Sequence, residues 1–454
     1  MPLIFKKVHG PRSSQSGIAL LLVIGSIVLL TMLSVELAYN AQIEYHLAYR
    51  QKQRLQAYYL AQSAYHLTLL ELKMGNAVQS QVGRAVEQAN VNLAVDLSVP
   101  LCQQFPINTG LLRMLGSGEG MDQGPGTRDQ RPEAGEQGPT EEDTAGLSGM
   151  GGFHLGGMEE FLEFEGDFEA ECFDDSSRID LNYFYTQNPE APSAEGQENS
   201  YDAYKKFIVQ FLAQPKFEEL FKDQKTPIPE IVRNIADWVD PNDVINEWGG
   251  GQGGSEESLY RDTALGDWTT KNGKFSTPGE IFRVAGVRDD WWIPLSEYFT
   301  IYGITDPKGN PQINVCRAPT EVTQALILRY LETRKDLPPL PLGDPEVMDR
   351  LVMAVLEGCT GTKPDKNKIA QDLDKALLEV LKVGPPVEII PGEGGYAPKT
   401  SPFADWIAAE SRFYRLAMRG QVQDTVVEIE AVMDLGEGGG ADTRKWKLVY
   451  WRIN

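Results

Sequence analysis

The residues best suited by type and spacing to a chemical role are oxygen-bearing side chains on both sides of a glycine-rich stretch. One group surrounds Pro241 at the end of a predicted helix, and the other follows the glycines. Hard cations such as Ca²⁺ bind six to eight oxygens, often from loops, and a bound cation removes the repulsion between packed carboxylates. The spacing is not that of an EF-hand, so a solvated acidic loop is the alternative to a calcium site. The candidate ligands are Asp237, Asp240, Asn242, Asp243, Glu256 and Glu257.

The histidines argue against the commoner catalytic sites. The chain has only His9, His46, His66 and His154, so residues 155–454 contain none. A Ser-His-Asp or Cys-His mechanism and a His-ligated zinc site all need histidine. No G-x-S-x-G, Walker A or H-E-x-x-H motif is present. A net charge of −23 also repels phosphate backbones. We therefore expect neither an enzyme nor a nucleic-acid-binding protein.

The four cysteines, Cys102, Cys172, Cys316 and Cys359, are widely spaced and form no C-x-x-C pair. Zinc ribbons and thioredoxin-like redox sites are therefore disfavoured. Single cysteines of this kind are usually small buried hydrophobic residues. An even number in an oxidising compartment also permits one or two disulfides, and three full pairings stay open at this point.

The elements that must position these groups begin with a basic segment followed by an apolar one. Lys6, Lys7 and Arg12 precede a nearly all-apolar run from Ile18 to Val35, and the first acidic residue is Glu36. Such a helix can cross a bilayer, with its basic flank in the cytoplasm and the rest of the chain outside. A secretory signal peptide would have a shorter apolar region that ends at small residues. The remaining interpretations are a plain signal anchor and a type IV pilin-like leader cleaved between Gly17 and Ile18.

The helix beyond the membrane separates these two interpretations. Residues 36–73 contain no Pro or Gly, and apolar residues recur at helical spacing from Leu47 to Leu72. We therefore predict one helix from Ile18 to about Lys73, ~80 Å long, stopped by Met74-Gly75-Asn76. A simple anchor does not need this length. A pilin does, because its apolar half packs in the filament core and its amphipathic half packs on its own head.

The rest of the chain is predicted to run from strands to a helical block and back to strands. Residues 91–101 (VNLAVDLSVPL) alternate like a strand, and two short strands flank a turn at residues 174–177. Residues 113–158 are rich in Gly, Pro and acids and are predicted to be a disordered loop. Helices are predicted at 201–221, 229–239, 320–334, 345–357 and 366–382, with another opened by a capping box at Thr277-Pro278-Gly279-Glu280. The last three strands are 412–423, 424–435 and 446–454. This order suggests an α+β head with an inserted all-α domain.

Several blocks of the chain together resemble general secretion pathway protein K, the minor pseudopilin K of type II secretion systems. The ordered run of these blocks is specific, and it covers most of the chain apart from residues 113–158. The blocks are the Gly17–Ile18 junction with its apolar helix, QAYYLAQSAYHLTLLELK, FDDSSRIDLN, NIADWVDPND with GSEESLY, and KNGKFSTPGEIFRVAGV through INVCRAP.

The resemblance implies a type IV pilin-like α+β fold with a long N-terminal helix, a small antiparallel sheet and a large inserted all-α (SAM-like) domain. The implied segments are a leader at 1–17, the membrane and pilin helix at 18–73, the first part of the head at 74–112, the loop at 113–158, strands at 159–200, the inserted domain with its calcium site at 201–395, and C-terminal strands at 396–454.

The resemblance also implies a role. Prepilin peptidase would cleave after Gly17, and the new amine of Ile18 would be methylated. Leu22 stands at the fifth mature position, where most pilins have Glu and the K subunits do not. A Glu in an apolar bundle is costly without a neighbour's amine. Its absence therefore suits a subunit at the pseudopilus tip, which helps to start assembly and export. The implied partners are the I and J minor pseudopilins, the inner-membrane assembly platform and the peptidase, with most of the chain in the periplasm.

The helical domain of this family binds calcium, and the matching residues include those proposed above, with Tyr260 as a further candidate. Two departures are Asn242, where the family usually has Asp, and Cys316-Arg317 in place of Asn-Thr within INVCRAP. Two other functions stay as alternatives. One is a minor pilin of a type IV pilus or DNA-uptake machine, and the other is a membrane-anchored periplasmic hydrolase that uses carboxylates and a metal.

Overall fold

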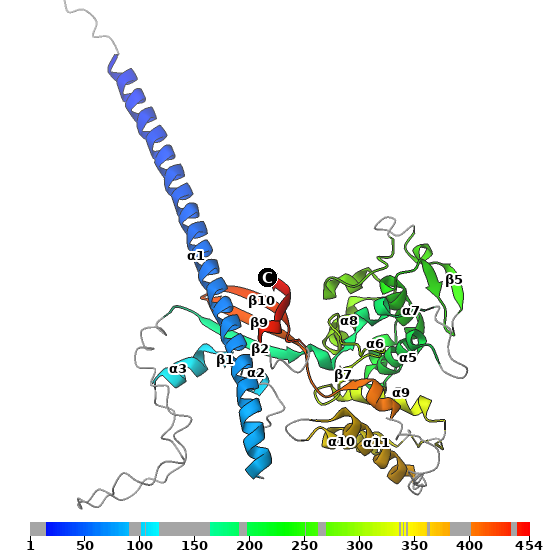
Figure 1. Cartoon of the computed structure of the whole chain (residues 1–454). Coiled ribbons are helices and arrows are strands. Elements are labelled where there is room, and N and C mark those ends of the chain that lie inside the picture. Colours follow the sequence, from blue (N-terminus) through cyan, green and yellow to red (C-terminus); the bar gives the residue numbers. More distant parts are fainter. Residues whose placement is uncertain are drawn as a thin grey trace, which may run out of the picture.

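The structure is a computed structural model. It describes residues 15–89, 101–104, 106–117, 164–189, 198–249, 251–261, 269–335, 337–338, 340–341, 344–360, 364–381, 401–436 and 443–454. One long helix extends well beyond the rest of the molecule, a small sheet packs beside its middle part, and a mainly helical block lies on the far side of the sheet (Figure 1). The expected α+β architecture, with a long N-terminal helix and a small antiparallel sheet, is confirmed.

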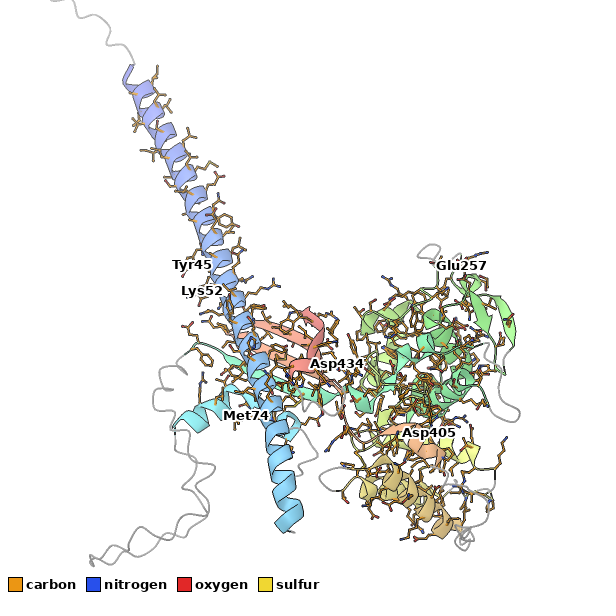
Figure 2. All side chains as sticks on the ribbon, in the orientation of Figure 1. Tyr45, Lys52, Met74, Glu257, Asp405 and Asp434 are labelled. Atoms are coloured by element: carbon orange, nitrogen blue, oxygen red, sulfur yellow. A yellow bond between two sulfur atoms is a disulfide. The ribbon has the colours of Figure 1, made fainter. Side chains whose placement is uncertain are left out.

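The long helix α1 spans Gln15–Ala89. It begins near the predicted start but continues past Met74-Gly75-Asn76, so the predicted stop is wrong. A single glycine costs a helix only about 1 kcal/mol, and no proline follows it before the helix ends at Ala89. Figure 2 shows the upper part of α1 with side chains on all sides and no other element against it. Among the residues that the structure describes, α1 from Ile18 on is long and apolar enough to be a candidate membrane anchor.

The sheet has the strand order β1-β2-β9-β10-β11, and every neighbouring pair is antiparallel. The three predicted C-terminal strands are confirmed as β9, β10 and β11, and the strand before the turn at 174–177 is confirmed as β2. The bounds are β1 Ile107–Asn108, β2 Asp167–Asp174, β9 Phe413–Val422, β10 Thr425–Asp434 and β11 Lys447–Ile453.

Two short helices, α2 (Leu101–Gln104) and α3 (Thr109–Ser117), flank β1. The predicted strand at 91–101 lies outside the described residues except for Leu101, which begins α2. The predicted disordered loop at 113–158 is wrong at its first five residues, because these complete α3. Its remainder, residues 118–158, lies outside the described part of the chain.

The helix α1 packs directly on the backbone of the sheet. Ala57, Ala61 and Ala64 are fully buried on its sheet-facing side. They face a core made of alternate residues of β2, β9 and β10, which includes Phe168 and Leu416. A Cβ placed on Gly420 of β9 would lie 2.0 Å from the carbonyl oxygen of Ala57. Small residues on both elements therefore set this close approach of helix and sheet.

The helical block contains seven α-helices within the described residues, and the predicted helices at 201–221, 229–239, 320–334, 345–357 and 366–382 are confirmed. A 3₁₀ turn at Pro215 divides the first of them into α5 and α6. The bounds are α5 Ser200–Leu212, α6 Glu218–Phe221, α7 Ile228–Val239, α8 Asp289–Leu295, α9 Thr320–Thr333, α10 Pro345–Gly358 and α11 Lys366–Leu381.

The block is not wholly helical, which corrects the expectation of an all-α insertion. Short strands pair within it: β3 (Ile179–Asp180) with β6 (Phe299–Thr300), β4 (Val244–Asn246) with β5 (Gln252–Ser255), and β7 (Ile313–Asn314) with β8 (Ile407–Ala408). Its hydrophobic core also includes residues outside the proposed bounds of 201–395, from Ile179 to Ile407. The chain on both sides of the insertion thus helps to build its core.

Short 3₁₀ helices complete the block and its connections. The predicted capping box at Thr277 is wrong: Thr277 caps no helix with its side chain, and Glu280 accepts instead from the backbone N–H of Ser276 at 2.9 Å. The bounds are η2 Asp175–Ser177, η3 Leu181–Thr186, η4 Pro215–Phe217, η5 Glu256–Leu259, η6 Pro278–Arg283, η7 Ser296–Tyr298, η8 Pro402–Asp405 and η9 Thr443–Lys445.

All four cysteines form disulfides, so the expectation of free buried cysteines is wrong. Cys102 pairs with Cys172 and joins α2 to β2 in the sheet region. Cys316 pairs with Cys359 and joins the segment before α9 to the end of α10. Each half of the molecule therefore has one covalent link. This pattern is typical of a protein that folds in an oxidising compartment.

Candidate metal centre

Three of the predicted ligands meet where α7 ends. Asp237 lies in the last turn of α7, and Asp240 caps it by donating its N–H to the carbonyl of Ala236 at 2.9 Å. The helix stops here because the next residue is Pro241, which disfavours helical backbone at Asp240. The β4–β5 hairpin then turns the chain back, and Glu256 follows it at the start of η5. The hairpin thus places Glu256 against the end of α7.

The ligand atoms of Asp237, Asp240 and Glu256 all lie within 4.8 Å of one another, and the three side chains are 2%, 0% and 0% exposed. Oxygens that share one Ca²⁺ are each ~2.3–2.6 Å from it, so opposite ligands lie about 5 Å apart. The three carboxylates are therefore close enough to bind one cation together.

Some carboxylate oxygens of the cluster accept hydrogen bonds, and others have no hydrogen-bond partner. The N–H of Asn246 donates to Oδ1 of Asp237 at 3.1 Å, and its Nδ2 donates to Oδ2 of Asp240 at 2.9 Å. The hydroxyl of Tyr201 also donates to this Oδ2, at 2.5 Å. By contrast, Oδ2 of Asp237 and both carboxylate oxygens of Glu256 are buried without a hydrogen-bond partner. Buried polar atoms rarely stay unpaired, so these three oxygens point to a ligand.

The three carboxylates share an environment that opposes their charge. Burial raises the pKa of Asp237 to about 7, and Asp240 adds to the shift by repulsion. Burial likewise raises the pKa of Asp240 to about 6. The pKa of Glu256 rises most, to about 9, first through burial and then through repulsion by Asp237 and Asp240, while the nearby Thr270 acts in the opposite direction. A divalent cation would reverse this balance by favouring the charged forms.

The other candidate ligands make contacts of their own. Asn242 lies beside the cluster: its N–H donates to Oδ1 of Asp240 at 3.2 Å, and its Oδ1 accepts from the N–H of Val244 at 2.8 Å and from Nδ2 of Asn246 at 3.5 Å. Asp243 is exposed and accepts from the side chain of Asn272. Glu257 forms a surface ion pair with Arg261 at 3.2 Å and lies at the outer end of the block in Figure 2. The hydroxyl of Tyr260 accepts from the N–H of Ala285 at 3.2 Å. The structure therefore brings together the three carboxylates of Asp237, Asp240 and Glu256, with Asn242 beside them.

The sequence analysis missed the residues that surround the cluster, namely Tyr201, Lys205 and Asn246. Tyr201 and Lys205 lie four residues apart on α5 and so face the same way. A lysine among the apolar positions of a helix is a signal that could have been noticed, because a buried lysine needs a partner. Asn246 lies inside a short apolar strand and gave no comparable signal.

The arrangement fits a structural cation site better than a catalytic one. The donor set is all oxygen, which suits Ca²⁺ or another hard cation. A catalytic metal keeps an open position for water or substrate, whereas these carboxylates are enclosed. Such a cation would tie the end of α7 to η5 and offset the mutual repulsion of the carboxylates. This enclosure argues against the hydrolase alternative.

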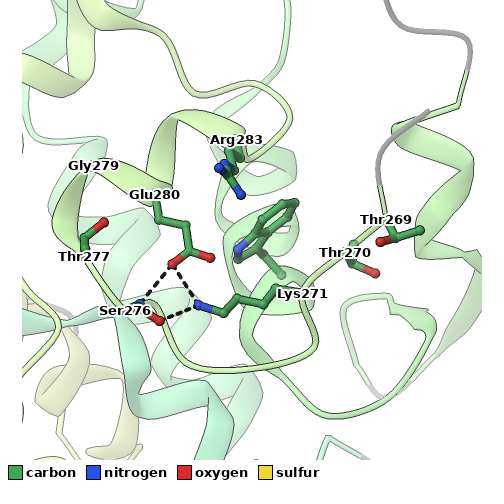
Figure 3. Close-up of a pocket in the computed structure, with 9 residues that line it drawn as sticks. Thr269, Thr270, Lys271, Ser276, Thr277, Gly279, Glu280 and Arg283 are labelled. Atoms are coloured by element: carbon green, nitrogen blue, oxygen red, sulfur yellow. Dashed lines mark hydrogen bonds and ion pairs between the residues drawn. The ribbon is translucent and has the colours of Figure 1, made fainter. Parts of the chain in front are cut away.

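A pocket of about 820 Å³ is lined by Trp238, by η6 and by the segment before it (Figure 3). Within it, Nζ of Lys271 contacts Oε2 of Glu280 at 2.8 Å and Oγ of Ser276 at 2.9 Å. Burial alone would raise the pKa of Glu280, but Lys271 and the N–H of Ser276 outweigh it and hold this pKa below its usual value. The opposite charges of Lys271 and Glu280 thus neutralise each other within the pocket.

The predicted processing residues lie at the free end of α1. Gly17 is within its first turn, and the side chains of Ile18 and Leu22 are 62% and 68% exposed. Nothing in the described part of the chain packs against this end. The structure therefore leaves the Gly17–Ile18 junction far from both cores.

No protein-family model and no curated protein sequence matches the chain. Among solved structures, the chain is similar to a chain in the crystal structure of the GspK-GspI-GspJ complex from the enterotoxigenic Escherichia coli type 2 secretion system. The identity is 12% and the TM-score is 0.36. The match covers 64% of this chain and 80% of that chain.

Proposed function

We propose that this chain is a minor pseudopilin of a type II secretion system, a structural subunit of the tip of the pseudopilus, and not an enzyme. In this role it helps to start pseudopilus assembly and thus protein export, together with the I and J minor pseudopilins and the inner-membrane assembly platform. Prepilin peptidase removes residues 1–17, and the bulk of the chain lies in the periplasm, where its two disulfides can form.

The continuity of α1 carries this proposal. Its apolar half from Ile18 to Val35 is exposed throughout, and one face of the same unbroken helix is buried against the sheet between Ala57 and Leu72. A membrane anchor that only tethers a domain does not need a rigid connection to that domain. A subunit that is extracted from the membrane into a filament does, because the helix must transmit its position to the head.

A second face of α1 supports packing against other helices. Leu47, Leu55 and Tyr59 are 55%, 55% and 57% exposed, although they lie beyond the apolar membrane segment. Large apolar side chains grouped on an exposed face commonly mark an interaction surface. In the proposed filament, this face contacts the helices of the neighbouring pseudopilins.

Two features favour the tip over the body of the filament. Leu22 replaces the glutamate that most pilins use to contact a neighbouring subunit's amine. The helical block also lies far to one side of α1 (Figure 1), where its bulk would hinder the stacking of a further subunit. A subunit at the tip has neighbours on only one side. It therefore needs neither the glutamate nor a narrow head.

We also propose that Asp237, Asp240 and Glu256 bind one Ca²⁺ as a structural ion of the helical block. The three unpaired buried oxygens support this assignment. The ion supplies the positive charge that lets these carboxylates stay ionised inside the block, and neighbouring residues of the chain hold the carboxylates in position. Asn246 and Tyr201 fix the remaining oxygens through the hydrogen bonds described above.

Mass spectrometry of the protein extracted from membranes tests the filament proposal. In cells with an active prepilin peptidase, we expect a mature chain that begins at Ile18, with or without one methyl group. Gly17→Leu should leave the leader attached. Gly25→Leu is the matched control, because Gly25 lies in the same apolar helix with open space around it, and this variant should still be cleaved at Gly17. A wild-type chain that still begins at Met1 would overturn the proposal.

A further inference from the structure

The helical block contains one lysine that is wholly buried. Lys205 of α5 is 0% exposed, and its Nζ lies 2.8 Å from Oδ1 of Asp202. The same Nζ donates to the carbonyl oxygen of Asn246 at 3.0 Å. It also lies 4.8 Å from the ring centroids of both Tyr201 and Trp248. Two acceptors and two aromatic faces thus hold a full positive charge inside the protein.

The contacts of Lys205 lead directly to the candidate metal centre. Asn246, whose carbonyl accepts from Lys205, donates to Asp237 and Asp240. Tyr201, whose ring lies under Nζ, donates its hydroxyl to Asp240. The ammonium group is therefore separated from the carboxylate cluster by one layer of residues. The Lys205 charge also acts on Asp237 and Asp240 through space, in the direction that lowers the pKa of both.

With all of its carboxylates ionised, this region carries more negative than positive charge. Lys205 is paired with Asp202, and Asp237, Asp240 and Glu256 supply three more acidic groups, all buried. In a buried environment, charges act on one another more strongly and over longer distances than in water. A resident ammonium group therefore has two opposite effects. It stabilises the carboxylate cluster while the cation is absent, and it repels a cation that binds there.

We propose that Lys205 is a built-in counter-charge of the metal centre, which keeps the cluster folded without a cation and lowers the affinity of the site for Ca²⁺. This inference rests on the metal site proposed above. It makes Lys205 a positioning residue and not a ligand. Its consequence is a site that exchanges its ion reversibly while the block stays folded, instead of one that folds only around the ion.

Calcium titration of the full-length, oxidised protein in a non-ionic detergent tests this inference, with isothermal calorimetry as the readout. Lys205→Met keeps the length and apolar part of the side chain and removes the charge, and we expect it to bind Ca²⁺ roughly tenfold more tightly. Asp202→Asn leaves the ammonium without its counter-ion, so it should bind more weakly by a similar factor. The double variant Asp202→Asn/Lys205→Met removes both charges and should bind like the wild type.

A packing role alone predicts a different result, namely weaker binding in all three variants. That outcome would overturn the inference, as would equal affinity of Lys205→Met and wild type. Circular dichroism in EDTA shows whether each variant is folded before titration, and Lys205→Met should unfold at a lower temperature than the wild type there. Lys206→Met is the matched control, because Lys206 pairs with Glu198 at the surface and is 47% exposed. Lys206→Met should change neither the affinity for Ca²⁺ nor the unfolding temperature in EDTA. If the wild type itself binds no Ca²⁺, the metal site fails and not only the role of Lys205.

Discussion

The core beneath α1 is lined mainly by apolar side chains such as Ala57, Leu416 and Ile429, whereas the core of the helical block also encloses Lys205 and three carboxylates. Both cores bury large hydrophobic surfaces, and each region carries one disulfide. The two cores differ in how their buried charged groups are neutralised. The sheet region pairs its buried carboxylates Asp175 and Asp434 with the guanidinium groups of Arg415 and Arg412. In the helical block, by contrast, three buried carboxylates face one another.

This difference predicts two kinds of sensitivity. Close packing responds to volume, because interiors have few voids to absorb an added methyl group. Buried charge responds to pH and to ions, because both change the number of unpaired charges. We therefore expect the sheet region to be sensitive to small increases in side-chain size and insensitive to calcium. The helical block should respond strongly to calcium and to pH.

The largest effect is expected from Gly420→Ala in the sheet region. The added methyl group would lie 2.0 Å from the carbonyl oxygen of Ala57, so α1 must move away from β9. Overpacking of this kind typically costs 1–3 kcal/mol, and we expect about 3 kcal/mol because the contact is with backbone. Chemical denaturation followed by hydrogen exchange and mass spectrometry measures this loss separately for the sheet and for the block.

The matched control is Gly254→Ala in β5, where no atom lies within 4 Å of the added methyl group. This variant should change the free energy of unfolding by less than about 0.5 kcal/mol. Equal effects of the two substitutions would mean that α1 does not seat on β9 as described. Close packing of α1 on β9 would then not distinguish the sheet region from the helical block.

Much of the sheet region could be predicted from the sequence, because its pattern is local. The alternation in residues 412–434 gives β9 and β10 with the correct faces inward, and the apolar spacing of residues 36–73 gives most of α1. The end of α1 was missed because Met74-Gly75-Asn76 was taken as a stop signal, whereas the helix continues to Ala89. The pairing of Cys102 with Cys172 was also beyond reach, since it depends on α2 and β2 lying side by side in space.

The second effect concerns calcium and should be confined to the helical block. Ca²⁺ at 100 times its dissociation constant should stabilise the block by about 2.7 kcal/mol relative to EDTA. Hydrogen exchange should slow in α7 and η5, which supply the ligands, and stay unchanged in β9 and β10. Magnesium is a useful comparison, because it prefers a smaller octahedral site and keeps its water. Equal slowing in both regions would contradict the separation of the two cores.

The candidate site was predictable only in part. The sequence suggested an acidic cluster from residue types alone, and three of its six members do converge. It could not show that Asp243 and Glu257 lie at the surface, because neighbouring residues in a turn point in different directions. Nor could it show that Asn246 and Lys205 surround the cluster, because these contacts join α5, α7 and the β4–β5 hairpin. Spacing finds groups that are close in sequence, whereas a site is completed by groups that are close in space.

The smallest effect separates charge from packing within the block. Burial and two neighbouring carboxylates raise the pKa of Glu256 from the ordinary value of 4.5 to about 9. A raised pKa stabilises the fold fully below the unfolded value, and this contribution is lost as the pH rises toward the folded value. In EDTA, the wild-type block should therefore lose stability between about pH 4.5 and pH 9. Glu256→Gln has no charge to bury, so its stability should change less over this range.

At pH 8 in EDTA, we expect Glu256→Gln to exceed the wild type by on the order of 2 kcal/mol, measured by thermal denaturation of the full chain. In calcium the order should reverse, because the variant lacks a ligand. Glu257→Gln is the control: Glu257 is half-exposed and pairs with Arg261 at the surface, so its loss should matter by less than about 1 kcal/mol. A Glu256→Gln protein that is less stable than the wild type in EDTA would show that this carboxylate contributes packing and hydrogen bonds. The helical block would then resemble the sheet region more closely than its buried charges suggest.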